Sequence, residues 1–256
     1  MSDHIDIKIA DSIQTVRFNR PEKKNALTMD MYSAMTEALR DADANADIRV
    51  TLITGGETMF TAGNDILDFL QTPPMDEQSP VVQFLFTIST AEKPIVAAVN
   101  GVAVGVGTTM LLHCDLVYAG ENARLQLPFV NLALVPEAGS SLLLPQMMGH
   151  QRAAELLLLG DFFSAETGRE AGFITQVCPD DQVLATAQAA ALQLAAAPPA
   201  ALRTAKALMK QANAERLQET IRTEAGYFGR MLQSPEAIEA FQAFTERRKP
   251  DFSKFQ

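Results

Sequence analysis

The sequence predicts an α/β fold that is followed by a C-terminal helical region. At 256 residues and 47% hydrophobic, the chain is long enough to bury a full core as one large domain, alone or with a small appendage. Over the first half, short strand patterns alternate with helical patterns in the order strand, helix, strand of a crossover unit. After Gly149 the pattern is almost wholly helical.

The chain opens with a predicted hairpin. Residues 5–9 and 13–18 alternate apolar and polar side chains around a short connection, which is typical of two strands with one buried face. Thr28 is placed to cap a helix that carries Met31 and Met35 on its apolar face. Residues 50–56 then predict a short buried strand that ends at glycines.

The middle of the chain adds a loop, a helix and a buried strand. Asp65 is placed to cap a helix after residues 60–66, which are also typical of an ordinary strand-to-helix turn. Residues 71–80 contain three prolines and predict an exposed loop. Residues 93–100 predict a buried strand, and residues 101–109 lead from it into an apolar helix that extends through Leu112. Strands are predicted over residues 116–118 and 124–127, with 173–177 as the one late strand. The other helices are predicted over residues 81–91, 152–159, 164–171, 183–195, 199–211, 214–232 and 235–247.

Composition excludes several classes of partner. The net charge of -10 and the pI near 4.8 argue against a nucleic-acid backbone or an anionic membrane as a general partner. The N-terminus lacks the basic and apolar regions of a signal peptide, so we expect a cytoplasmic protein. Cys114 and Cys178 have neither CxxC spacing nor a nearby pair of histidines, and we interpret both as core thiols rather than metal ligands.

Glu137 is the candidate for chemistry, because it lies in an apolar and small-residue stretch, residues 132–144. One interpretation is a capping glutamate, since Gly139 and the following residues are typical of the first turn of a helix, where a carboxylate is favoured. The other is a general base whose pKa is raised by its apolar neighbours, so that it abstracts a carbon-bound proton near neutral pH. This stretch alone leaves both interpretations open.

Other polar residues receive structural interpretations. Residues 105–110 contain two glycines but lack the third glycine and the acidic partner of a dinucleotide-binding fingerprint. We interpret His113, inside an apolar segment, as a core histidine. Asp115 is interpreted as a structural hydrogen-bonding acid.

Several separated motifs, taken together, resemble the enoyl-CoA hydratase/isomerase (crotonase) superfamily. The motifs are NRP at residues 19–21, NAL at 25–27, FTAGND at 60–65, KPIVAAVNG at 93–101 and CDL at 114–116. The resemblance covers nearly the whole chain. It implies a spiral of repeated ββα units over residues 1–195 that holds an acyl-CoA site, and a C-terminal helical region over 196–256 that builds homotrimers or hexamers. The ligand it implies is a thioester of coenzyme A as substrate, with no further cofactor and no metal.

The same resemblance implies the roles of particular residues. The backbone N–H groups of Asn64 and Val106 would form an oxyanion hole, and a preorganised donor there is worth about 3 kcal/mol. The implied substrate and coenzyme A contacts are Lys23, Lys24, Ala26, Ala62, Gly63, Asn64, Asp65, Ile66, Gly105 and Phe129. Lys23 and Lys24 are equally typical of solvated surface lysines. Arg247, Arg248 and Lys249 resemble a C-terminal basic segment that approaches the nucleotide in relatives, and are equally typical of a solvated helix end.

Two departures from the family pattern bear on the reaction type. Typical hydratases hold glutamates at the positions of Thr109 and Phe129, and neither of these residues titrates to activate a water. Residues 136–141 instead resemble the segment of the peroxisomal type of Δ3,Δ2-enoyl-CoA isomerase, whose catalytic base is the glutamate, here Glu137. The leading hypothesis is therefore isomerisation of 3-enoyl-CoA to trans-2-enoyl-CoA. The alternatives are an enoyl-CoA hydratase or related acyl-CoA lyase, and a non-catalytic subunit that binds CoA esters.

Overall fold

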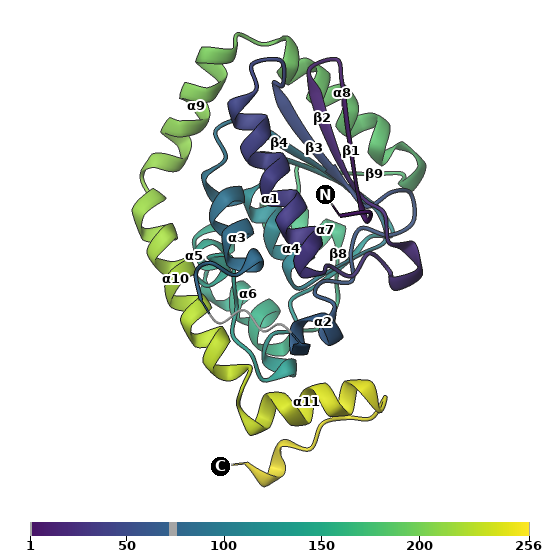
Figure 1. Cartoon of the computed structure of the whole chain (residues 1–256), viewed down its shortest axis with the longest axis vertical. Helices are drawn as coiled ribbons and strands as arrows, with labels where there is room; N and C mark the ends of the chain where they lie inside the picture. The colour runs from purple at the N-terminus through teal and green to yellow at the C-terminus, as the bar shows by residue number, and fades with distance from the viewer. Residues whose placement is uncertain (1, 72–75, 256) are drawn as a thin grey trace.

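The computed structural model describes residues 2–71 and 76–255 and forms two sheets covered by helices (Figure 1). The strands are β1 Ile5–Ala10, β2 Ile13–Phe18, β3 Val50–Thr54, β4 Ile95–Val99, β5 Val102–Val104, β6 Leu116–Gly120, β7 Arg124–Gln126, β8 Phe163–Ser164 and β9 Gln176–Cys178. The helices are α1 Met29–Ala44, α2 Ile66–Gln71, α3 Pro80–Thr90, α4 Val106–Thr109, α5 Ser140–Met148, α6 His150–Ala154, α7 Ala165–Glu170, α8 Val183–Ala196, α9 Pro199–Gln211, α10 Ala214–Met231 and α11 Pro235–Thr245. Short 3-10 or π turns are η1 Pro21–Lys23, η2 Met110–His113, η3 Val130–Leu132, η4 Glu155–Leu159, η5 Asp180–Gln182 and η6 Phe252–Lys254.

The larger sheet has six strands in the order β1-β2-β3-β4-β6-β9. Strands β1 and β2 are antiparallel, and their connection has positive φ at Asp11 and Ser12, as a two-residue hairpin turn requires. The remaining neighbours are parallel, joined by crossovers that include α1 between β2 and β3. The smaller sheet, in the order β5-β7-β8, lies over the end of the larger one where β4 leads into β5.

Both faces of the inner strands β3 and β4 are buried, which explains why these strands are almost wholly apolar, whereas the edge strand β1 is largely exposed. On β4, Ile95, Ala97 and Val99 join the main core with α1 and α3, while Val96 and Ala98 face α8. In Figure 1, α8 covers the opposite side of the sheet from α1. Because successive side chains of a strand point to opposite faces of the sheet, the apolar residues of β4 are divided between one core on each face.

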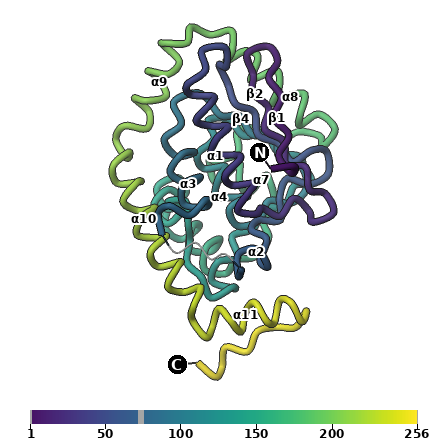
Figure 2. Tube along the Cα trace, viewed as in Figure 1, coloured from purple at the N-terminus to yellow at the C-terminus, as the bar shows by residue number. Residues whose placement is uncertain are grey.

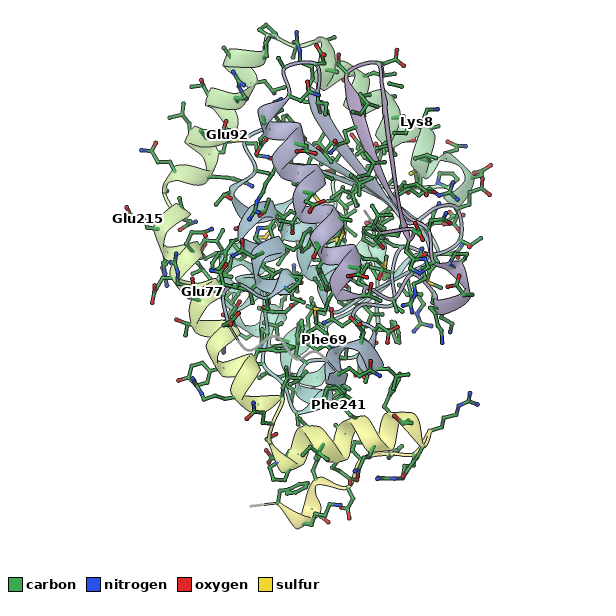
Figure 3. All side chains as sticks on the ribbon, viewed as in Figure 1. Lys8, Phe69, Glu77, Glu92, Glu215 and Phe241 are labelled. Atoms are coloured by element: carbon green, nitrogen blue, oxygen red, sulfur yellow. The ribbon has the colours of Figure 1, made fainter. Side chains whose placement is uncertain are left out.

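The C-terminal helices wrap around this body. The trace in Figure 2 shows α9 and α10 following one another along one side of the molecule, with α11 turning across its end. Phe241 of α11 is buried, and Figure 3 shows it on the side of the helix that faces the rest of the chain. Helix α10 packs against α3 and α5, so a late segment of the chain reaches the middle of the molecule. None of the described helices is both long enough and apolar enough to cross a bilayer.

Most elements lie where the sequence predicts them. The hairpin, α1 with its Thr28 cap, and α9 over residues 199–211 are confirmed. The predicted buried face of the hairpin is present in β2 but not in β1, where Ile7 and Ile9 are exposed because β1 is the edge strand of the sheet. Of the predicted exposed loop over residues 71–80, residues 72–75 lie outside the described part; Gln71 ends α2, Asp76 to Ser79 form a hydrogen-bonded turn, and Pro80 begins α3.

One prediction about secondary structure is incomplete and another is wrong. Residues 101–109 do lead into a helical segment that extends through Leu112, formed by α4 and η2. The strand β5 comes first, however, bounded by Gly101 and Gly105, both at positive φ, and its β-branched Val102 and Val104 pair with β7. The late strand is β9 at Gln176–Cys178, and it is not the only one, because β8 pairs with β7. A two-residue strand has too short a pattern to be recognised in the sequence.

Candidate active site

Glu137 is the centre of the candidate site and is 4% exposed. It lies in the loop between η3 and α5, and its pocket is lined by Phe69, Val81, Val82, Leu85, Ala138, Ile221, Ala225 and Phe228. Apart from Ala138, which is next to Glu137 in the chain, these side chains come from α2, α3 and α10, so three helices keep water from the carboxyl group. Phe69 of α2, labelled in Figure 3, packs edge to face on Phe228 of α10.

The environment of Glu137 raises the pKa of its carboxyl group into the neutral range. Burial raises its pKa from the usual 4.5 to about 7, the hydrogen bond from Thr109 opposes the rise, and the charge of Glu224 adds to it. Thr109 Oγ1 donates to Glu137 Oε1 at 2.9 Å. A position that holds an acid in typical hydratases therefore carries a hydroxyl that orients the single carboxylate.

The structure decides against Glu137 as a helix cap. Its carboxylate accepts its hydrogen bond from Thr109, whereas the free N–H groups at the start of α5 are taken by Glu224. Gly139 N donates to Glu224 Oε2 at 2.6 Å and Ser141 N donates to Glu224 Oε1 at 3.0 Å. The cap that the sequence allowed for Glu137 is thus supplied by a residue of α10, and Glu137 remains available for chemistry.

The Asn64 N–H group is held free by the loop that contains it. Leu27 N donates to Gly63 O at 2.8 Å and Asp65 N donates to Leu27 O at 2.9 Å, which is the pattern of a parallel bridge centred on Leu27. In that pattern the N–H of the intervening residue points away from Leu27. Among the hydrogen bonds of the described residues, none uses the Asn64 N–H as donor.

The Val106 N–H is free for a different reason, because Val106 is the first residue of α4 and has no residue to bond to within the helix. The two N–H groups lie on neighbouring segments. Gly63 packs so closely on β5 that a Cβ atom there would come within 2.6 Å of the Val104 carbonyl oxygen. Thr61 and Ala103 also form a bridge between the same segments.

A polar network fixes the loop that carries Asn64. Arg20 Nη1 donates to Asp65 Oδ2 at 2.7 Å and to Ala26 O at 2.9 Å. Asp65 also accepts from Leu67 N at the start of α2, and its hydrogen bonds and ion pair with Arg20 outweigh burial and lower its pKa. The Asn25 amide donates to Phe60 O at 3.1 Å. The NRP and NAL motifs therefore hold the FTAGND motif in place.

Tyr32 bonds the side chain of Asn64 and interacts electrostatically with Glu137. It is not among the site residues predicted from the sequence. Its hydroxyl, on α1, donates to Asn64 Oδ1 in a short hydrogen bond. Burial, with the charge of Glu137 as a second cause, raises the pKa of Tyr32 well above its usual value, so the phenol stays a donor. The only signal in the sequence is a phenol on the apolar face of a predicted helix, where a buried tyrosine needs a partner.

The other predicted contact residues divide into two groups. Lys24, Ala26, Ala62 and Ile66 adjoin the Asn64 loop, and Ala62 N donates to Lys24 O at 3.0 Å. The side chains of Lys23 and Lys24 are exposed. Gly105 is the residue directly before α4, next to Val106. Phe129 instead lies in the main core, 4% exposed, before η3. Of the C-terminal basic residues, Arg248 is paired with Glu239 at 2.6 Å.

His113 and Asp115 have structural surroundings, as the sequence indicated. Burial lowers the pKa of His113 to about 4, so the ring is neutral, and its Nε2 bonds Ala138 O at 2.8 Å. Asp115 Oδ2 accepts from Ile95 N at 2.8 Å and from Lys206 Nζ at 2.7 Å. Within the described ranges, His, Cys, Asp and Glu side chains form no cluster able to hold a metal ion.

A buried carboxylate bonded to Thr109 of α4, and a glycine-containing loop packed on β5, lie on an α/β fold with a larger and a smaller sheet, and together they define the class of protein. The chain belongs to the enoyl-CoA hydratase/isomerase family, whose family model matches residues 8–255. It is 32% identical over 237 residues to 2,3-dehydroadipyl-CoA hydratase from Escherichia coli (strain K12), covering 91% of this chain and 92% of that protein. Enoyl-CoA delta isomerase 2 from Rattus norvegicus is 34% identical over 242 residues, which are 92% of this chain and 62% of that protein. The solved structure of Pseudomonas aeruginosa OdaA superposes with a TM-score of 0.94 at 50% identity, over 96% of this chain and 100% of that one.

Proposed function

We propose that this protein is a Δ3,Δ2-enoyl-CoA isomerase that converts 3-enoyl-CoA to trans-2-enoyl-CoA. The observation that carries the proposal is the state of Glu137: one buried carboxylate with a pKa of about 7, paired with a threonine where typical hydratases hold a second acid. Isomerisation moves one proton between two carbons, so one carboxylate suffices. Hydration also needs an activated water, and this pocket is built from apolar side chains.

The proposed mechanism uses two proton transfers. Glu137 takes a proton from C2, and the electron pair of that C–H bond moves into the thioester to form a dienolate with its charge on oxygen. The N–H groups of Asn64 and Val106 donate to that oxygen, each worth about 3 kcal/mol in the transition state. Protonated Glu137 then returns the proton to C4, and the double bond moves to C2–C3. The carboxylate is regenerated, and the reaction consumes neither water nor a redox equivalent.

The proposed ligand is an acyl thioester of coenzyme A with an alkyl chain. The side chains around Glu137 include phenylalanine, valine, leucine and isoleucine, so an acyl group beside the carboxylate would meet apolar surface, which suits a hydrocarbon rather than a polar group. The loop of Ala62, Gly63 and Asp65 would lie along the coenzyme, and the exposed Lys23 and Lys24 would meet its phosphates. No metal and no other cofactor enters the proposal.

Glu137→Gln tests the proposal, because glutamine preserves the shape of the side chain but cannot accept the C2 proton. We expect wild-type protein to convert 3-enoyl-CoA to trans-2-enoyl-CoA, and Glu137→Gln to lose at least about 10³-fold in kcat while still binding the thioester. Glu121→Gln, at an exposed glutamate, is the matched control and should retain full activity. Product analysis by chromatography with mass detection measures both.

The same assay separates the alternatives. If 2-enoyl-CoA is converted to a 3-hydroxyacyl-CoA faster than 3-enoyl-CoA is isomerised, the protein is a hydratase, as the name of the Escherichia coli relative says of that protein. If wild-type protein binds the thioesters but converts neither, it is a non-catalytic binding subunit. Either result overturns the isomerase proposal.

The protein is also proposed to act as a homotrimer or hexamer. The contacting elements α11, η3 and η4 carry exposed apolar side chains: Phe244 on α11, Val130 on η3, and Leu158 and Leu159 on η4. An exposed apolar surface of this kind is typical of a contact between subunits.

A further inference from the structure

Glu224 is a buried carboxylate that belongs to none of the family motifs and touches the segment next to the base. It is 6% exposed and comes from α10, more than eighty residues after Glu137. Its two oxygens accept from Gly139 N at 2.6 Å and from Ser141 N at 3.0 Å, and it also accepts from the hydroxyl of Ser141. A carboxylate placed on the first N–H groups of α5 is a strong cap, because it meets both free donors and the positive end of the helix dipole.

The capped turn is continuous with Glu137. Ala138 and Gly139 both have positive φ, an arrangement that persists only where neighbours hold it. On one side of this turn, His113 Nε2 bonds Ala138 O at 2.8 Å. On the other side, Glu224 binds Gly139 N, and Ser140 N closes the turn onto Glu137 O at 3.0 Å. The direction of the Glu137 side chain is therefore set from two elements, η2 and α10.

We propose that Glu224 is a positioning residue for Glu137, which holds the turn at residues 138–141 from α10 and places a second negative charge beside the base. The inference rests on the proposed role of Glu137 as the catalytic base. With this role, α10 in the C-terminal region helps to position the catalytic base and does not only pack against the rest of the chain.

The charge of Glu224 is not neutralised by neighbours. Burial raises its pKa to about 7, against the lowering effect of its hydrogen bonds from Ser141 and Gly139. No salt bridge among the described residues involves Glu224 or Glu137. The other titratable groups nearby are Tyr32 of α1, which stays protonated, and His113 of η2, which is neutral because its pKa falls to about 4. As Glu224 ionises, it opposes the ionisation of Glu137 and keeps the pKa of the base high.

Glu224→Gln tests the inference, since it keeps the size of the side chain and one oxygen for the helix N–H groups but removes the charge. A base acts only when deprotonated, so kcat/KM for 3-enoyl-CoA should rise with pH through the pKa of Glu137. We expect the midpoint of this rise to move to lower pH by about 0.5 unit or more in Glu224→Gln, and kcat above pH 8 to fall several-fold because one hydrogen bond of the turn is lost. Glu219→Gln, at an exposed glutamate of the same helix, is the matched control and should leave the midpoint in place.

An unmoved midpoint in Glu224→Gln would overturn the inference, because a purely structural residue changes rate or stability without moving that midpoint. If Glu224→Gln does not fold by circular dichroism, Ser141→Ala takes its place: a several-fold lower kcat with nearly unchanged KM supports the inference, and unchanged kcat overturns it. The proposed function fails separately, when wild-type protein shows no isomerisation or when Glu137→Gln stays active.

Discussion

At the scale of the residue, the carboxyl group of Glu137 is kept where its charged form is unfavourable. A base with a pKa of about 7 is half ionised at neutral pH, whereas an exposed glutamate is a far weaker proton acceptor. The apolar pocket that raises the pKa thereby strengthens the proposed base, and it also costs stability, because folding must desolvate the carboxylate. The proposed activity and the stability of the fold are thus opposed at this one side chain.

The stability of the fold should therefore depend on Glu137 and on pH. The folded pKa of about 7 lies above the usual 4.5, so the folded state binds more protons between these values and the contribution of Glu137 to stability falls as pH rises through them. Glu137→Gln should raise the free energy of unfolding at pH 8 by up to about 3 kcal/mol and change it much less at pH 4. Urea unfolding at the two pH values measures the difference. Equal effects at both would show that the carboxyl group is not held in a desolvating environment.

At the scale of the element, the site depends on how closely the Asn64 loop packs on β5. The free N–H of Asn64 belongs to that loop and the free N–H of Val106 belongs to α4, which directly follows β5. Only a glycine at position 63 allows the approach, since its φ is +85° and the Val104 carbonyl fills the place of a side chain. The spacing of the proposed oxyanion donors is therefore set by the contact between two backbones.

Gly63→Ala should separate these backbones. The added methyl group would meet the Val104 oxygen at 2.6 Å, so the loop must shift, and a shift of about 1 Å in a catalytic group costs on the order of 10²-fold in rate. We expect kcat/KM to fall by about that factor while the protein still folds. Gly172→Ala is the control, because Gly172 has positive φ but open space where the methyl group would lie. That variant should lose thermal stability and retain activity; comparable kinetic losses in both would mean that strain, and not the clash, is responsible.

At the scale of the whole molecule, the C-terminal helices complete the site and also present an apolar surface. Phe228 of α10 lines the pocket of Glu137, and Glu224 of α10 bonds the turn that follows Glu137. In the same C-terminal region, Phe244 of α11 is 61% exposed. A water-exposed group of this size is unfavourable unless another surface covers it. The C-terminal region thus contributes both to the candidate active site and to the surface of the proposed subunit contact.

Phe244→Asp combined with Leu158→Asp should weaken self-association. We expect wild-type protein to elute with three or six times the mass of its 27.8 kDa chain, and the double variant to shift toward the monomer, because charges would be buried in the contact. Size-exclusion chromatography with light scattering measures the mass. Leu192→Asp, on the exposed face of α8, is the control at a distant surface. Monomeric wild-type protein would contradict the proposal.

Much of the fold was predictable because local rules and tertiary packing agree. The alternation of residues 5–18 matches the hairpin, and the Thr28 hydroxyl accepts from Met31 N as an N-cap should. The sequence did not predict β5 within residues 101–109, where apolar residues and glycines fit a helix or a strand equally well. There the pairing with β7, more than twenty residues later, decided in favour of β5.

The sequence by itself determined the α/β class, the family and the candidate base, because separated motifs and strand periodicity are local properties of the chain. Only the tertiary structure decided that Glu137 is a buried acid and not a cap, since the competing carboxylate comes from α10. The spacing 217, 221, 224 and 228 did contain a signal, a glutamate within an apolar helical face. Its partner was not readable, because which N–H groups a buried carboxylate meets depends on contacts between residues far apart in the chain.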